Sequence, residues 1–140
     1  MEIAVISVVL LWISYTDIQS RIISNNAIVI LMMCISFGFV FNDSLSFNIL
    51  SLGITFAIGI SIYAMGFWGA GDVKLSCVLS VLVPFEHLFS SYYYMVILGG
   101  VISLFYLIKS MISTSKHDDG IPYGVAISLG FISVIFSTSL

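Results

Sequence analysis

Charged residues are so widely spaced in this chain that they leave long uncharged runs, and these runs limit what it can fold into. The 140 residues include four Lys or Arg and seven Asp or Glu, while 60% are hydrophobic. A soluble domain would carry about 25% charged residues. Uncharged runs cover 22–42, 44–71, 87–108 and 120–140, and a bilayer core of about 30 Å needs about 20 apolar residues per helix. The sequence therefore predicts an integral membrane protein.

The same composition excludes several classes of function. A net charge of −3 with four basic residues cannot neutralise a phosphate backbone, so we expect no nucleic-acid partner. Cys34 and Cys77 lie in apolar stretches without a CxxC pair, which argues against a cysteine metal site or a disulfide framework. His87 and His117 have no partners at ligand spacing, so we expect no metal ion.

Polar and glycine-rich breaks divide the chain into six expected helices. The first is the run 3–16, which we expect to end at Asp17, and the others cover 27–41, 47–67, 73–82, 92–108 and 123–137. The fourth would cross the bilayer only if Lys74 snorkels to the headgroups and the bilayer thins locally. We expect an all-α, polytopic bundle of about six transmembrane helices that forms one domain over 1–140, with full crossing of the first and fourth helices left open.

The basic residues predict an orientation in the membrane. Arg21, Lys74, Lys109 and Lys116 all lie in odd-numbered loops between the expected helices. The positive-inside rule places those loops in the cytoplasm and both termini outside. Glu2 is acidic where a secretory signal would be basic, so we expect the first helix to be retained.

Two carboxylates lie on this same predicted face, Asp17 at the end of the first helix and Asp72 at the start of the fourth. Two carboxylates within hydrogen-bond reach share a proton, because like charges so close cannot both ionise near neutral pH. Such a pair can activate water against a peptide carbonyl, and Gly69 and Gly71 would let an extended substrate come close. The alternative is that both aspartates only cap helices, Asp72 as the N-cap of the fourth.

Three segments carry a resemblance to a known family. Residues 17–25, 69–75 and 121–127, followed by Gly130, closely resemble in order and spacing the three signatures of the type IV prepilin peptidases, which are membrane aspartyl proteases of the GxGD class. The resemblance covers the whole chain. One departure is Ser24, where many members have proline before the asparagine of the first signature, and we expect from it a local loop change without loss of chemistry.

The resemblance implies an activity and a location. Asp17 and Asp72 match the two catalytic aspartates of the family. The implied reaction is cleavage of the short, basic, cytoplasmic leader from prepilins or pilin-like (Flp or pseudopilin) precursors at the inner membrane, with pilus assembly components as further partners. The chain looks like the short form found with Flp/Tad-type pilus systems. It lacks the paired CxxC motifs of the long enzymes, so we expect neither methyltransferase activity nor S-adenosylmethionine binding, and no other cofactor.

Several residues keep two interpretations. The third signature contributes Pro122, Tyr123 and Gly124. On the family pattern these would line the substrate cleft, and as plain structure they would begin a helix and allow close packing. Lys74 is expected to anchor at the headgroups, with tuning of the aspartate pair as the alternative. Asp118 and Asp119 would either attract a basic leader or form a solvated acidic loop.

Three rival functions remain open at this stage. An archaeal-type preflagellin peptidase of the same family would share the mechanism and differ in substrate. An inactive membrane scaffold would keep the fold without the chemistry. An ion conduit would need polar residues at mid-depth along several helices, whereas the charges here gather at one face.

Overall fold

The computed structural model describes residues 2–41, 47–112 and 122–138, and within these ranges all regular structure is α-helical. The expectation of an all-α chain with six helices is confirmed for this part of the chain. The helices are α1 (Glu2–Ser20), α2 (Asn25–Phe41), α3 (Ile49–Ala64), α4 (Ala70–Ser80), α5 (Phe85–Ile112) and α6 (Tyr123–Thr138).

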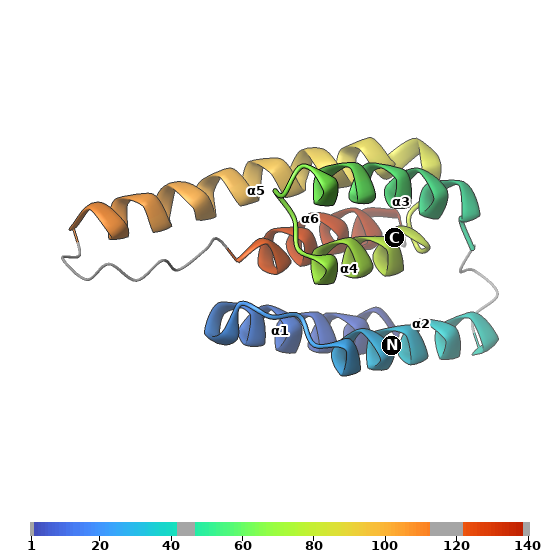
Figure 1. Cartoon of the computed structure of the whole chain (residues 1–140). Helices are drawn as coiled ribbons and strands as arrows, with labels where there is room; N and C mark the ends of the chain where they lie inside the picture. The colour runs from blue at the N-terminus through green and yellow to red at the C-terminus, as the bar shows by residue number, and fades with distance from the viewer. Residues whose placement is uncertain (1, 42–46, 113–121, 139–140) are drawn as a thin grey trace.

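The six helices form three layers of two (Figure 1). One outer layer holds α1 and α2, the other holds α3 and α5, and the central layer holds α4 and α6. Helix α6 packs against α1 and α5, while α4 packs against α2 and α3. Helices α4 and α6 are therefore packed from both sides. Residues at the ends of these two helices are positioned by contacts with both outer layers.

The central and outer helices differ in what they expose. Side chains of α4 and α6 supply much of the buried core, including Leu75, Leu79, Ile127 and Phe131. The outer helices expose large apolar side chains along their outward faces, which is the surface that lipid covers in a membrane protein. The protein therefore has a core buried between its helices and an apolar outer surface on its outer helices.

Two described helical stretches, Ile3–Ser20 and Phe85–Ile108, are long and apolar enough to cross a membrane. Helices α2, α3 and α6 are apolar but shorter, and the 11 residues of α4 reach only about 16 Å. A bundle with six full spans therefore stays a prediction, and α4 is too short to cross an unthinned bilayer.

The end of the first helix differs from the expectation. Helix α1 continues through Asp17 to Ser20, because its polar side chains bond within the helix: the Ser20 hydroxyl donates to the Thr16 carbonyl at 2.8 Å. The helix ends at Arg21, whose φ of 56° lies in the left-handed region that is common just after a helix. Asp17 thus lies in the last full turn of a helix instead of in a loop.

Other boundaries also differ from the expected ones. Helix α5 begins at Phe85, seven residues before the expected start, because Pro84 has a helix-like φ and its carbonyl accepts the first bond from the His87 N–H at 2.9 Å. Helix α3 ends at Ala64, since Gly66 takes a φ of 80°. Helix α4 begins at Ala70 instead of residue 73.

A glycine sets how closely α5 and α6 approach. A Cβ added at Gly130 would lie 2.7 Å from the backbone nitrogen and Cα of Met95. Backbone cannot yield as a side chain can, so only glycine allows this helix crossing. The close approach fixes the position of α6, whose first turn forms part of the site described next.

Candidate active site

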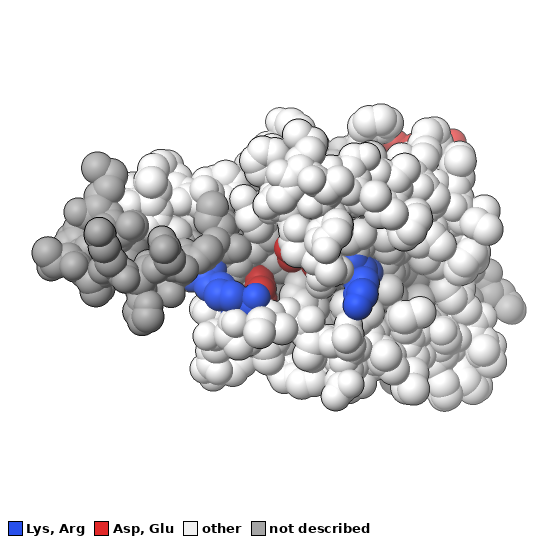
Figure 2. Space-filling view, in the orientation of Figure 1, with Lys and Arg blue, Asp and Glu red and all other residues white. Residues whose placement is uncertain are grey.

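A cavity of about 370 Å³ lies where α1 ends and where α4 and α6 begin. Its lining residues are Asp17, Arg21, Ile22, Ile23, Gly69, Gly71, Asp72 and Tyr123. Asp17 and Asp72, which are 55 positions apart in the chain, therefore face one space. Figure 2 shows red acidic surface recessed between two blue basic patches on one face of the molecule.

Asp17 is held by the first turn of α6. Its side chain is buried, and its Oδ2 accepts a hydrogen bond from the Gly124 N–H at 2.9 Å. The Val125 N–H adds a second bond to the same carboxylate. The first N–H groups of a helix have no partner within that helix and form its positive end, so a carboxylate from α1 satisfies the start of α6.

Asp72 is held by the start of its own helix. Its Oδ2 accepts a hydrogen bond from the Gly69 N–H at 2.9 Å, and its own N–H donates to the Gly69 carbonyl at 3.1 Å. Gly69 is the N-cap, so the alternative interpretation, in which Asp72 itself is the N-cap, is wrong. The reason is local: with α4 beginning at Ala70, Asp72 occupies the third helical position, from which an acidic side chain reaches back to the cap.

Burial is the main influence on the pKa of Asp72. Desolvation raises the pKa of the Asp72 carboxyl from 3.8 to about 6; the bond from Gly69 lowers this pKa, and the nearby charge of Asp17 raises it further. A carboxyl whose pKa lies near 6 exchanges its proton close to neutral pH. The Asp72 carboxyl therefore titrates near neutral pH, beside a second carboxyl whose charge raises its pKa.

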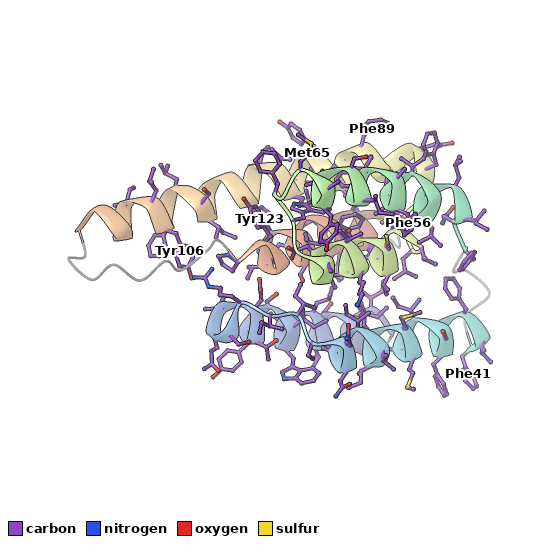
Figure 3. All side chains as sticks on the ribbon, in the orientation of Figure 1. Phe41, Phe56, Met65, Phe89, Tyr106 and Tyr123 are labelled. Atoms are coloured by element: carbon purple, nitrogen blue, oxygen red, sulfur yellow. The ribbon has the colours of Figure 1, made fainter. Side chains whose placement is uncertain are left out.

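Arg21 forms part of the cavity wall, and the sequence interpretation did not include it in the site. Its guanidinium lies over the Tyr106 ring of α5, with Cζ 4.7 Å from the ring centroid. Figure 3 shows Tyr106 and Tyr123 at this end of the molecule. Ile22 and Ile23 were missed in the same way. The signal that could have found all three is that they lie four to six positions after Asp17, inside the first signature segment and in the linker to α2.

The residues predicted to bind substrate do not all line the cavity. Gly69, Gly71 and Tyr123 line it. Gly124 instead supports Asp17 from behind, because a Cβ there would lie 2.8 Å from the Asp17 Oδ2. Pro122 is fully buried and is not part of the lining.

Lys74 does not line this cavity. Its Nζ donates a hydrogen bond to the Asn25 Oδ1 at 2.8 Å, which joins the start of α4 to the start of α2. The contact links the first and second signature segments through their side chains. Asp118 and Asp119 lie outside the described residues.

The chemistry that this arrangement can perform is proton transfer between two carboxyl groups and a third group placed between them. Among the residues that the structure describes, no three His, Cys, Asp or Glu side chains are grouped so as to hold a metal ion. The backbone N–H bonds fix one oxygen of each carboxylate.

A comparison with protein families gives one match. The model of the type IV leader peptidase family matches residues 4–108, three quarters of the chain, and this range includes both aspartates of the cavity. No curated protein and no solved structure gives a significant match.

Proposed function

The chain belongs to the type IV leader peptidase family, and from this premise we propose that it is an aspartic endopeptidase that removes the leader from type IV prepilins or pilin-like precursors. The family supports prepilin processing in general and marks the chain as a peptidase. The family and two long apolar helices indicate a membrane protein. The aspartate pair, the side of the membrane and the class of precursor form our proposal.

The observation that carries the proposal is the convergence of Asp17 and Asp72 in one cavity. They come from different layers of the fold, and each has one carboxylate oxygen fixed by a backbone N–H at the start of a helix. Helix capping explains the backbone bonds that each side chain accepts. It gives no reason for two caps of like charge to face the same space, whereas a shared proton does.

The proposed reaction is a direct attack by water. The ionised carboxyl takes a proton from a water molecule while the water oxygen bonds to the scissile carbonyl carbon. The protonated carboxyl donates its proton to the carbonyl oxygen. When the tetrahedral intermediate collapses, the carbon–nitrogen bond breaks and the amine leaves with a proton from the carboxyl that first acted as base. The second carboxyl recovers its own proton from the intermediate's hydroxyl, so no covalent enzyme intermediate forms.

The cavity walls suit an extended peptide. Gly69 and Gly71 present backbone without a Cβ beside Asp72, so a substrate strand can approach that carboxyl. We assign Tyr123 to substrate contact on the same grounds, because it lines the cavity at the start of α6. Gly124 acts through the position of Asp17, and Pro122 through the start of α6.

The substrate side is proposed from the family. The family implies prepilin substrates, and the resemblance of the signature segments extends this to precursors with a short, basic leader. We propose that this end of the bundle faces the cytoplasm at the inner membrane. Arg21 follows α1 at this end, and Lys74 and Lys109, which the sequence analysis expected in loops, lie near the start of α4 and the end of α5; the positive-inside rule favours such an end for the cytoplasm. We propose that the enzyme has no methyltransferase activity.

Co-expression with a tagged precursor that carries a basic leader tests the proposal. Precursor and mature bands are compared for wild type, Asp17→Asn and Asp72→Asn. Glu86→Gln serves as the matched control, because it removes one carboxylate charge from an exposed position on α5. Acid–base groups contribute about 10²- to 10⁴-fold, so each aspartate variant should lose cleavage by that factor while the control keeps it.

Two results would contradict the proposal. If both aspartate variants cleave like wild type at equal membrane levels, the carboxyl groups are structural caps and the chain acts as a scaffold. If wild type cleaves a preflagellin precursor but no prepilin, the mechanism stands and the substrate class is the archaeal type.

A further inference from the structure

A second cavity of about 450 Å³ lies on another side of α4, between that helix, α2 and the start of α3. We call it the α2–α4 groove. Its lining residues are Ile28, Met32, Ile35, Ser36, Phe39, Phe47, Leu52, Lys74, Cys77, Val78 and Val81. All but Ser36 and Lys74 are apolar, so the groove suits a hydrocarbon guest.

The length of the groove matches one leaflet of a bilayer. Along α2 it extends from Ile28 to Phe39, which is about 16 Å of helix. Half of a bilayer core is about 15 Å. The far end is lined by the edge-to-face pair of Phe39 and Phe47, whose ring centroids are 5.9 Å apart. One extended acyl chain therefore fits the groove from end to end.

One cation stands at the opposite end from the two phenylalanines. Lys74 belongs to the first turns of α4, and Cys77, Val78 and Val81 follow it at helical spacing along the same lining. Its described hydrogen bond goes to the neutral amide of Asn25, at 2.8 Å, so that bond leaves the positive charge uncompensated. An apolar slot of one leaflet's length with a cation at one end is complementary to an acyl chain that carries an anionic headgroup.

The groove is separate from the active-site cavity. The two linings have no residue in common. Asp72 and Lys74 are two positions apart on α4, so they point about 200° apart around the helix. A peptide bound at the aspartates would therefore not continue into the groove, which favours a lipid over the precursor as its occupant.

We propose that the α2–α4 groove binds one anionic phospholipid, with an acyl chain along α2 and α4 and its phosphate on Lys74. The bound lipid would hold α2 against α4 at the level where the first and second signatures meet. This site needs only a membrane location and does not depend on the peptidase activity.

Native mass spectrometry of the purified full chain, titrated with phosphatidylglycerol or phosphatidylcholine, tests the charge requirement. A single Lys near an anionic headgroup corresponds to about fivefold in affinity. Wild type should bind phosphatidylglycerol about fivefold more tightly than phosphatidylcholine, and Lys74→Gln should lose that preference. Lys116→Gln removes one positive charge elsewhere in the sequence, and this variant should keep the preference for phosphatidylglycerol. Equal loss in both variants, or none in Lys74→Gln, would overturn the proposal.

A filling substitution tests the apolar part. Ser36→Phe places a ring in the groove and should weaken binding of both lipids, whereas Ile30→Phe, at an exposed position about 120° around α2 from Ser36, should not. A phosphatidylglycerol with a photoreactive group at its chain end should label residues near Phe39 and Val81. Labelling of the groove by a photoreactive precursor helix instead would overturn the lipid assignment. Binding is measured without cleavage, so an inactive peptidase would leave these readings unchanged.

Discussion

The two carboxylates of the active-site cavity are held in the same way by different parts of the chain. Asp72 accepts the N–H of Gly69, three positions before it in sequence. Asp17 accepts the N–H of Gly124, which is 107 positions away on another helix. One anchor forms as soon as α4 forms, whereas the other exists only when α1 and α6 are packed together.

The two anchors also differ in how closely they fit. A Cβ at Gly124 would lie 2.8 Å from the Asp17 Oδ2, while a Cβ at Gly69 would lie 3.3 Å from the Asp72 Oδ2. The first distance forces the carboxylate to move, and the second requires a shift of a few tenths of an ångström. The comparison teaches that the position of Asp17 is the more sensitive of the two, and substitutions at both glycines can check this.

Gly124→Ala should have the largest effect. The added methyl group displaces the Asp17 carboxylate from the cavity, and misplacement of a catalytic group by about 1 Å costs about 100-fold. The measurement is kcat/KM for leader cleavage by purified protein. Gly100→Ala, whose added Cβ would meet nothing within 4 Å, is the matched control and should be neutral. A Gly124→Ala enzyme with wild-type kcat/KM would refute the tight fit.

Gly71→Ala should reduce kcat/KM by about tenfold. The new Cβ would lie 3.0 Å from the Ile23 Cβ and 3.4 Å from the Ile23 carbonyl oxygen, so the cavity wall must shift and the space for substrate narrows. Thermal unfolding should stay cooperative, because the change is confined to the wall. Full turnover in this variant would show that the glycine is not needed for substrate approach.

The contribution of Asp72 to the stability of the fold should depend on pH in a defined direction. The folded-state pKa of about 6 exceeds the ordinary 3.8, so this carboxyl stabilises the fold below pH 3.8, and that contribution is lost as the pH rises through 6. After allowance for solvent screening we expect a loss of about 1 kcal/mol between pH 4 and 7.5.

Asp72→Asn removes this titration. The midpoint of thermal unfolding of the variant, relative to wild type, should therefore rise by about 2 to 4 °C between those two pH values. A constant difference across the range would show that burial does not raise the pKa of Asp72.

Gly69→Ala should have the smallest effect, a reduction in kcat/KM of about threefold. Its Cβ meets the Asp72 Oδ2 at 3.3 Å and no side chain from another helix. The helix start can absorb that contact by a small rotation of the carboxylate. A loss equal to that of Gly124→Ala would mean that both anchors fit equally tightly.

Parts of this protein follow from sequence because they depend on composition or on short separations along the chain. Sparse charge predicted an all-α membrane protein, and the signature segments predicted the family. The bond between Asp72 and Gly69 is of the same kind, since any helix that begins at Ala70 brings these two residues within reach. The boundaries were wrong where polar side chains continued a helix, as at Asp17 and at the start of α5.

Tertiary structure alone decided which faces meet. None of the six helices that the structure describes has a strong amphipathic pattern. In a membrane the lipid-facing side is as apolar as the core, so periodicity does not show which side is buried. Three features therefore could not be predicted: the central position of α4 and α6, the hydrogen bond from Gly124 to Asp17, and the place of Arg21 in the lining of the cavity. The sequence singled out Asp17 and Asp72 as the candidate groups, and only helix packing decided that they face one cavity.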